Sequence, residues 1–350
     1  MDLDDTNLMQ SLDSLNMLAE IDGLPNQLES AWKLGLEQDL PSMSGINQVL
    51  VAGMGGSAIG ADLLAAYIEP LSSVPLLVQR DYTLPAWAKG SHTLVIASSH
   101  SGNTEETLSV FEQAQKSGCQ LLVIATGGKL AQLALEAGIP VWKFVHNSQP
   151  RAAVGFSFGL LLALFVRLGF IPVQDADMAD ALQALRAQQS GLLANVPAVK
   201  NPAKRQAGQL MGRGVVILGS GLLAPVARRW KGQVSELAKA WGQFESLPEA
   251  DHNSLAGIEN PEAMLTNTLV IFLRSTADHP RNKLRSELTQ RSFMVAGMGT
   301  DFYQAKGTSR LAQLWTALHF GDYTAYYLAV AYGVDPTPIP AISGLKAAMS

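Results

Sequence analysis

The sequence predicts an α/β protein with two parallel-sheet domains. This prediction rests on its length, on the alternation of predicted strands and helices, and on a pattern that occurs twice in the chain. The chain has 350 residues, more than the roughly 250 to 300 at which one hydrophobic core usually stops growing. Short apolar runs alternate with helix-length segments in two stretches, as in parallel sheets with crossover helices. VLVAGMGGSAIG (49–60) parallels VVILGSGLLAP (215–225), and TLVI recurs at Thr93 and Thr268. The two pairs of segments are separated by similar distances along the chain, which suggests a degenerate duplication, with chance recurrence as the alternative.

Residues 1–45 are predicted to form a helical arm. Leucines recur at helical spacing from Leu8 to Leu18, and a second apolar group surrounds Trp32. Apolar positions three or four residues apart are typical of amphipathic helices.

The first sheet domain is predicted over residues 46–190. Its strands are the short apolar runs QVLVAG, PLLVQ, TLVIAS, QLLVIAT and PVWKF. Helices are expected at 61–68 and 105–115 between these runs. The segment 152–168 is apolar on nearly every side, which predicts a helix buried between layers.

The second sheet domain is predicted over residues 205–335. The Ala- and Gln-rich segment 174–204 ends in VPAVKNPAK and favours a boundary near 190–205. Beyond it come VVILGS, a helix expected at 222–241, TLVIFL and the short apolar run RSFMVAG. Residues 336–350 are predicted to form a C-terminal tail.

Composition and charge narrow the classes of protein. Charged residues make up only 16% of the chain, against about 25% in an average domain. So little charge fits a buried parallel sheet, a large subunit interface, or both, and we expect a homo-oligomer. The net charge is −5 and no Lys/Arg run exceeds two residues, so no nucleic-acid partner is expected.

The number of cysteines and the hydropathy of the chain indicate the cellular compartment. The single cysteine, Cys119, excludes an internal disulfide and is expected to be a buried, inert thiol. The longest uncharged apolar stretch, 152–166, falls short of the ~20 residues of a spanning helix, and the N-terminus lacks a signal-peptide pattern. We therefore expect a cytoplasmic protein without a membrane partner.

Two Gly/Ser-rich loops are the candidate binding sites. GMGGSAIG (53–60) and SSHSGNTEET (98–107) each follow a predicted strand and enter a helix. Glycines allow close backbone approach, and a helix N-terminus offers free amides to an anion. Hydroxyls and amides without a Lys/Arg clamp suit a small phosphate monoester. The alternatives are a G-x-G-x-x-A dinucleotide fingerprint for the first loop, or simple turns and a Ser N-cap without a ligand.

These loops together resemble the sugar isomerase (SIS) domain, a flavodoxin-like sheet that binds phosphosugars. The wider pattern resembles the bifunctional phosphoglucose/phosphomannose isomerases from about residue 45 to the end of the chain. The motifs that carry this resemblance are PRAAVGFSFG (150–159), LAPVARRWKGQVSELAK (223–239), PEADHNSLAG (248–257) and GDYTAYYLAVAYGVDPTPIPAISGLK (321–346).

The resemblance implies that the chain isomerises glucose 6-phosphate, and mannose 6-phosphate as well, to fructose 6-phosphate. A glutamate, Glu236, would carry a proton between C1 and C2 through a cis-enediol, with Arg151 stabilising the enediolate. His252, donated across a homodimer interface and assisted by Lys346 in the C-terminal tail, would open the sugar ring. The phosphate cradle would consist of Gly55, Gly56, Ser57, Ser99, Ser101 and Thr104. No cofactor or metal is implied.

Two other functions stay open at this point. One is a non-catalytic sugar-phosphate regulator on the same fold, and the other is an amino-sugar phosphate isomerase. The chain departs from the family's common residues at His100, Ser235 and Ser254, where tyrosine, asparagine and glutamate are frequent. Without the resemblance, Glu236 would be interpreted as a solvated residue paired with Lys239 on a polar helix face.

Overall fold

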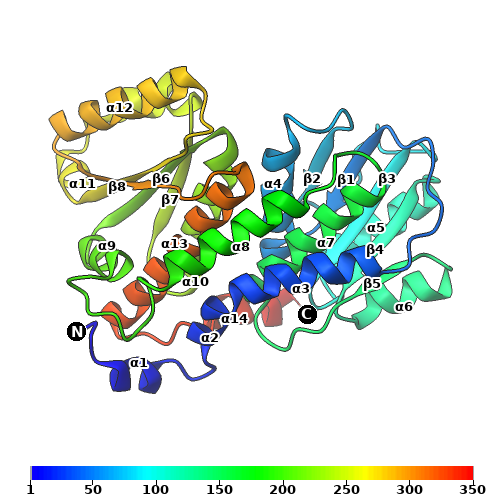
Figure 1. Cartoon of the computed structure of the whole chain (residues 1–350), viewed down its shortest axis with the longest axis horizontal. Coiled ribbons are helices and arrows are strands. Elements are labelled where there is room, and N and C mark those ends of the chain that lie inside the picture. The colour runs from blue at the N-terminus through cyan, green and yellow to red at the C-terminus, as the bar shows by residue number, and fades with distance from the viewer. Residues whose placement is uncertain (1, 350) are drawn as a thin grey trace. The chain divides into compact units, whose positions relative to one another are not determined.

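A computed structural model describes residues 2–349, and the chain forms two compact units (Figure 1). Residues 24–178 form one unit, called the β1–β5 unit below. The other, the β6–β9 unit, combines the segment up to residue 23 with the chain from residue 179 onward. The division falls within helix α8 (Asp175–Gln189).

The β1–β5 unit contains a five-stranded parallel sheet in the order β2-β1-β3-β4-β5. Its strands are β1 (Gln48–Ala52), β2 (Leu76–Gln79), β3 (Thr93–Ser99), β4 (Gln120–Ala125) and β5 (Val141–Lys143). The central strands are buried on both faces, which explains their continuous apolar runs. The accompanying helices are α3 (Leu24–Glu37), α4 (Gly55–Ile68), α5 (Glu105–Lys116), α6 (Gly128–Glu136), the 3₁₀ turn η1 (Pro150–Ala153) and α7 (Val154–Arg167).

The strand order creates a switch point between β1 and β3. The chain leaves β1 for β2 on one side and returns to β3 on the other. The two strands pair in parallel, with Ala52 opposite Ala97, so their carboxyl ends meet at one edge of the sheet. Ligands of open α/β sheets bind at such a point, and both Gly/Ser loops start there.

Helix α7 is the predicted buried helix, and it packs through small residues. A Cβ atom added at Gly60 of α4 would lie 2.6 Å from the Ser157 side chain. One added at Gly159 would lie 2.7 Å from the Ala31 side chain of α3. Pro150–Arg167 is long and apolar enough to cross a bilayer by length and composition, and 78% of it is buried in the protein. This burial is that of a core helix.

The β6–β9 unit contains a four-stranded parallel sheet in the order β7-β6-β8-β9. Its strands are β6 (Gly214–Ser220), β7 (Gly242–Leu247), β8 (Thr268–Arg274) and β9 (Gly299–Gln304). The order repeats that of β2-β1-β3-β4. The glycine turn is repeated too, since Gly55 after β1 and Gly221 after β6 have φ of +50° and +45°.

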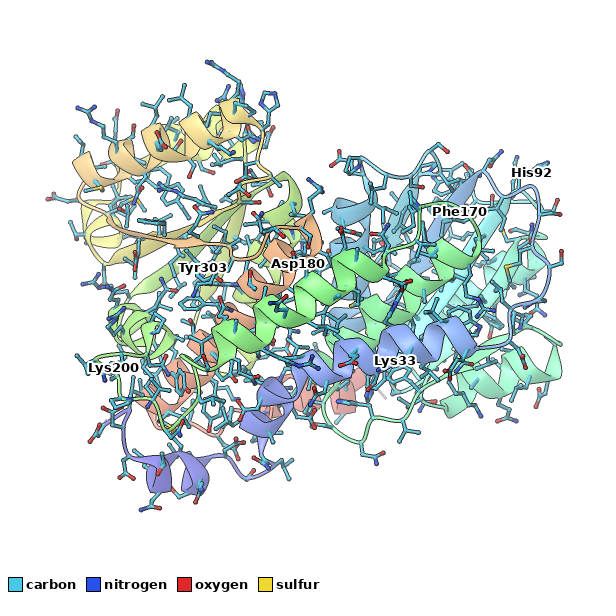
Figure 2. All side chains as sticks on the ribbon, viewed as in Figure 1. Lys33, His92, Phe170, Asp180, Lys200 and Tyr303 are labelled. Carbon is cyan, nitrogen blue, oxygen red and sulfur yellow. The ribbon has the colours of Figure 1, made fainter. Side chains whose placement is uncertain are left out.

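Helix α13, whose residues are almost entirely buried, packs against α1, α2, α9, η2 and α10 of this unit. Tyr303 of β9 (Figure 2) is buried with them, and its hydroxyl donates to the Thr316 carbonyl oxygen of α13 at 3.1 Å. The helices are α1 (Thr6–Leu12), α2 (Met17–Asp22), α9 (Pro202–Leu210), η2 (Gly221–Leu223), α10 (Ala224–Glu236), η3 (Glu249–His252), η4 (Ser254–Gly257), α11 (Glu262–Thr266), α12 (Pro280–Val295), α13 (Arg310–Tyr332) and α14 (Pro340–Met349).

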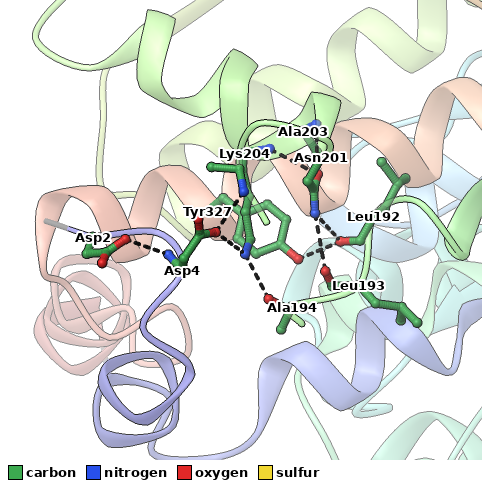
Figure 3. Close-up of polar contacts among 10 residues, drawn as sticks. Asp2, Asp4, Leu192, Leu193, Ala194, Asn201, Ala203, Lys204 and Tyr327 are labelled. Atoms are coloured by element: carbon green, nitrogen blue, oxygen red, sulfur yellow. Dashed lines mark hydrogen bonds and ion pairs between the residues drawn. The ribbon is translucent and has the colours of Figure 1, made fainter. Parts of the chain in front are cut away.

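A buried lysine connects the N-terminal segment to the rest of the β6–β9 unit (Figure 3). The Lys204 Nζ atom lies 3.0 Å from Asp4 Oδ1 and 2.8 Å from the Ala194 carbonyl oxygen. It also lies 5.5 Å from the centre of the Tyr327 ring. The ammonium group is therefore paired, hydrogen-bonded and covered by an aromatic face, as a buried charge requires.

The α/β class with two parallel sheets and a helical arm is confirmed, while several details differ. Helix α10 ends at Glu236, before the predicted end at residue 241. RSFMVAG is no strand-like run, because most of it forms the end of α12. The C-terminal tail contains helix α14. Cys119 is half-buried, donates to the Ala88 carbonyl oxygen at 3.4 Å, and has a pKa raised by burial.

The arm and the boundary also fall differently among the two units. Helices α1 and α2 belong to the β6–β9 unit, and α3 belongs to the β1–β5 unit. The domain bounds 46–190 and 205–335 stay a prediction about folding units.

Candidate functional site: a Gly/Ser cradle and four dispersed polar residues

The first loop makes a tight turn from β1 into α4. The Gly53 amide donates to the Gln79 carbonyl oxygen at 3.2 Å, and the Ser57 amide donates to that of Met54 at 3.1 Å. A Cβ atom added at Gly55 would meet no atom within 4 Å, so the turn is open above this residue. Ser57 is 5% exposed. The turn thus offers unobstructed backbone at Gly55, the first residue of a 14-residue helix, which suits an anion.

The second loop is held by its own hydroxyls. Ser99 Oγ lies 2.9 Å from Thr104 Oγ1 and accepts the Gly102 amide at 3.1 Å. Ser101 Oγ accepts the Asn103 amide at 3.2 Å. Gly102 has φ of +68° and its Cβ position is only 1.9 Å from the Gly127 carbonyl oxygen, so no side chain fits there.

The two loops touch at the switch point. A Cβ atom added at Gly53 would lie 2.8 Å from the Ser98 carbonyl oxygen. The structure therefore brings the six predicted cradle residues to one edge of one sheet. They are Gly55, Gly56, Ser57, Ser99, Ser101 and Thr104.

Arg151 lies against this cradle. Its side chain is 3% exposed, and its Cα would be 3.3 Å from a Cβ atom added at Gly56. Gln27 of α3 fixes the η1 turn, because Gln27 Nε2 donates to the Ala152 carbonyl oxygen at 2.9 Å and its Oε1 accepts the Gly155 amide at 2.8 Å. Sequence reasoning missed Gln27, which lies 125 residues from its partner.

His100 has a histidine partner that the sequence did not reveal. Its Nε2 atom lies 2.9 Å from Nδ1 of His146. The His100 ring makes an edge contact with Phe144, and the His146 ring makes one with Phe156. The second loop is thereby joined to the segment that leads from β5 to Arg151.

Glu236 is the last residue of α10 and is half-buried. Lys239, with φ of +55°, donates to the Glu236 carbonyl oxygen at 2.8 Å. The face that carries Glu236 is not solvated, because Arg229 and Gln233 are 5% and 2% exposed. The interpretation of this face of α10 as polar and solvated is therefore wrong.

The buried partner of α10 is Asp322 of α13. Arg229 donates to both Asp322 oxygens, from Nε at 3.1 Å and from Nη2 at 2.8 Å. This bidentate pair holds the helix that ends in Glu236. Asp322 was missed, although the motif GDYTAYY gave it a place in the family pattern.

His252 is exposed at the end of η3. The preceding residue, Asp251, anchors this turn to α12 by accepting Arg285 Nη1 at 2.9 Å and Thr289 Oγ1 at 2.6 Å. Ser254 Oγ donates to Glu245 Oε1 of β7 at 3.1 Å, so the loop retains a carboxylate contact.

Lys346 is exposed on α14, none of whose described residues is buried. The structure thus places Glu236, His252 and Lys346 on three different elements of the β6–β9 unit, α10, η3 and α14. Among residues 2–349, no three His, Cys, Asp or Glu side chains are grouped to hold a metal ion.

Known proteins resemble the chain along nearly its whole length. A family model described as the bacterial phospho-glucose isomerase C-terminal SIS domain matches residues 199–349. A bifunctional phosphoglucose/phosphomannose isomerase of Caldicellulosiruptor bescii is 38% identical over 94% of this chain and 98% of its own. Another, of Aquifex aeolicus, is 34% identical over 93% of this chain and 96% of its own.

A solved structure shows the same fold. A hypothetical protein of Thermus thermophilus superimposes with a TM-score of 0.76 and 18% identity, covering 98% of this chain and 92% of that one. Identity this low relates the folds and leaves the chemistry to the residues of the site.

Proposed function

The chain belongs to the family of bifunctional phosphoglucose/phosphomannose isomerases, and from this membership we propose that it interconverts glucose 6-phosphate, and mannose 6-phosphate as well, with fructose 6-phosphate. The observation that carries the proposal is the open Gly/Ser cradle at the switch point of the β1–β5 unit, with Arg151 packed against it. A cytoplasmic location is part of the same proposal.

The cradle would bind the substrate's phosphate. The amides at the start of α4 and the hydroxyls of Ser57, Ser99 and Thr104 supply donors to an anion. Gly55 leaves the approach open. The hydroxyls of Ser99 and Thr104 now bond each other at 2.9 Å, and we expect both to turn toward the phosphate when it binds.

Isomerisation would proceed by proton transfer between neighbouring carbons. Glu236 would remove the proton from the carbon beside the carbonyl and return it to the other carbon, through a cis-enediol. Arg151 would stabilise the negative charge of the enediolate, since a guanidinium stays charged at every physiological pH. His252 and Lys346 would move the proton that opens the ring.

The active form would be a homodimer that shares its sites. His252 is exposed on a turn that Asp251 holds in place, which suits a side chain that enters a partner's site. The low charged fraction of the chain, 16%, is also compatible with a large subunit interface.

Glu236→Gln tests the proposed base. Glutamine keeps the shape of the side chain and removes its basicity, so turnover should fall by at least ~10²-fold while substrate binding persists. The variant should still open the sugar ring and fail to exchange the C2 proton with solvent deuterium, as followed by NMR. Glu287→Gln, at an exposed position of α12, is the matched control and should retain turnover. Near-normal turnover in Glu236→Gln would overturn the mechanism.

A coupled assay of the wild-type protein tests the substrate range. We expect conversion of both glucose and mannose 6-phosphates to fructose 6-phosphate. A protein that binds these sugars and converts none of them would be a regulator.

A further inference from the structure

Lys239, three residues after the proposed base Glu236, has an unusual backbone conformation. Among residues 2–349, the non-glycine residues with a positive φ are Asn16 at +57° and Lys239 at +55°. Asparagine tolerates this left-handed region, whereas a lysine there brings its Cβ atom close to the following carbonyl oxygen. Glycine is the usual residue at such a position after a helix, so the lysine side chain must contribute something that glycine cannot.

The ammonium group of Lys239 returns to the end of α10. Its Nζ atom donates to the carbonyl oxygens of Glu236 at 2.8 Å and of Leu237 at 3.2 Å. The last carbonyl groups of a helix have no amide donor within the helix, and Glu236 is the last residue of α10. The left-handed turn at Lys239 thus allows its side chain to cap the helix that it follows.

The contact from Lys239 differs from the other contacts of α10. Val234 and Leu237 are buried, and Trp230 Nε1 donates to a carbonyl oxygen of α13 at 2.8 Å. These side chains fix where the helix lies, whereas the bond from Lys239 fixes the direction of the Glu236 peptide group itself. The Glu236 side chain starts from this same residue, so the direction in which it leaves the backbone depends on that peptide group.

The ammonium group also acts on the electrostatics of the helix end. The carboxyl end of a helix carries partial negative charge, which disfavours a carboxylate there and favours a cation. Glu236 lies at that end, and Lys239 supplies a cation 2.8 Å from the carbonyl oxygen of the same residue. Lys239 thereby offsets an unfavourable field at the residue that would take up the substrate's proton.

We propose that Lys239 is a positioning residue for the isomerisation, because it orients the peptide group of Glu236 and supplies positive charge at the helix end from which Glu236 acts. This inference rests on the proposed role of Glu236 as the base. Lys239 adopts an unfavourable φ in order to place its ammonium group. Replacement by glycine relieves the backbone and removes the cation, so stability and turnover should respond differently.

Steady-state kinetics and thermal unfolding of Lys239→Gly test the proposal. Turnover of glucose 6-phosphate should fall about tenfold, the effect of losing one charge-assisted contact, while KM changes by less than about twofold. The unfolding midpoint should not fall, because glycine accepts a positive φ without strain. With C2-deuterated glucose 6-phosphate, the isotope effect on kcat should be at least as large as in the wild-type protein, since the slowed step is the proton transfer.

Three further variants separate the ammonium group from the backbone. Lys239→Met keeps the strained backbone and the aliphatic stem without the donor, and it should be as slow as Lys239→Gly. Lys239→Arg retains a charged donor and should restore turnover to within about threefold of the wild-type value. Lys116→Met removes an exposed lysine from the last turn of α5 and should leave turnover unchanged.

Normal turnover or a lower unfolding midpoint in Lys239→Gly overturns the inference, because the ammonium group then serves stability alone. A slow Lys239→Gly protein with a smaller isotope effect overturns it too, since the loss then lies outside the proton transfer, and so does a Lys239→Arg protein that is equally slow. Comparison with Glu236→Gln separates this inference from the proposed function. A slow Glu236→Gln with a normal Lys239→Gly overturns only the role of the lysine, whereas normal turnover in Glu236→Gln overturns the roles of both residues.

Discussion

His319 is a fully buried histidine in the middle of α13, and its Nε2 atom lies 2.8 Å from the Ile21 carbonyl oxygen of α2. Burial lowers the pKa of His319 from 6.5 to about 4, against the smaller opposing effects of the Ile21 hydrogen bond and of Asp322. The neutral ring therefore belongs to the folded state, while the unfolded chain binds a proton near pH 6.5. This difference makes stability depend on pH.

We predict that the free energy of unfolding contributed by His319 is fully present above about pH 6.5 and declines as the pH falls toward 4. The lowered pKa sets the sign, because the unfolded state takes up the proton first, and the loss should reach about 3 kcal/mol at most. Urea unfolding of the wild-type protein and of His319→Gln, measured between pH 7 and 4, checks this. Glutamine retains a donor to Ile21, so the variant should show a flatter profile; parallel profiles would contradict the prediction.

The pair Arg229–Asp322 shows what residue-by-residue reasoning could not reach. A stripe of Arg229, Gln233 and Glu236 has the spacing of a solvated helix face. Arg229 and Gln233 are buried instead and Glu236 is half-buried, because Asp322, 93 residues later, neutralises Arg229. A long-range partner leaves no local pattern. The Gly/Ser cradle was predictable because each loop carries its turn, hydroxyls and helix start within a few residues.

The segment that leads into α1 is tied to the unit by a polar connection from Asp4 to the buried Lys204 of α9. The hydrogen bond from Lys204 is the main cause that lowers the pKa of Asp4. Asp4 Oδ1 also accepts the Ala198 amide at 2.7 Å. Asp4 therefore ties two segments of the unit to the start of the chain.

We predict that Asp4→Asn loosens α1 because it leaves the Lys204 ammonium without a counter-charge in a buried place, while α2 stays held by the hydrogen bond between His319 and Ile21. The cost should be on the order of 2 kcal/mol, seen as faster amide exchange in residues 6–12 and a lower unfolding midpoint. The double variant Asp4→Asn, Lys204→Met removes the uncompensated charge and should recover part of the loss. No recovery would mean that the ammonium is not the source of the instability.

Strands were predictable where they are short apolar runs, which includes the edge strands β2 and β5 of the first sheet. β1, β3, β4, β6 and β8 are continuous apolar runs, and each was predicted from the sequence. The edge strands β7 (GQFESL) and β9 (GTDFYQ) mix polar and apolar residues. Each of these two strands has solvent on one side, which allows a composition that resembles that of a loop.

For the whole molecule, we predict that two inactive proteins restore activity when mixed. If His252 enters the partner's site, a dimer of Glu236→Gln with His252→Ala contains one site with both residues intact. An equal mixture that exchanges subunits freely should regain about one quarter of wild-type activity, since half of the dimers are mixed and each has one working site of two. A coupled assay before and after exchange measures this. Exchange shown by mass spectrometry without recovered activity would place His252 in its own chain's site.

The close packing of α3, α4 and α7 has a consequence for how substrate fit is set. Their contacts at Gly60 and Gly159 are made largely by backbone, which has no rotamers with which to absorb an added methyl group. The first cradle loop continues into α4, and the turn that carries Arg151 continues into α7. The spacing of these helices therefore sets the distance between the cradle and the Arg151 guanidinium. In the proposed site, the preference for one sugar phosphate would then depend on Gly60 and Gly159, although neither glycine contacts the sugar.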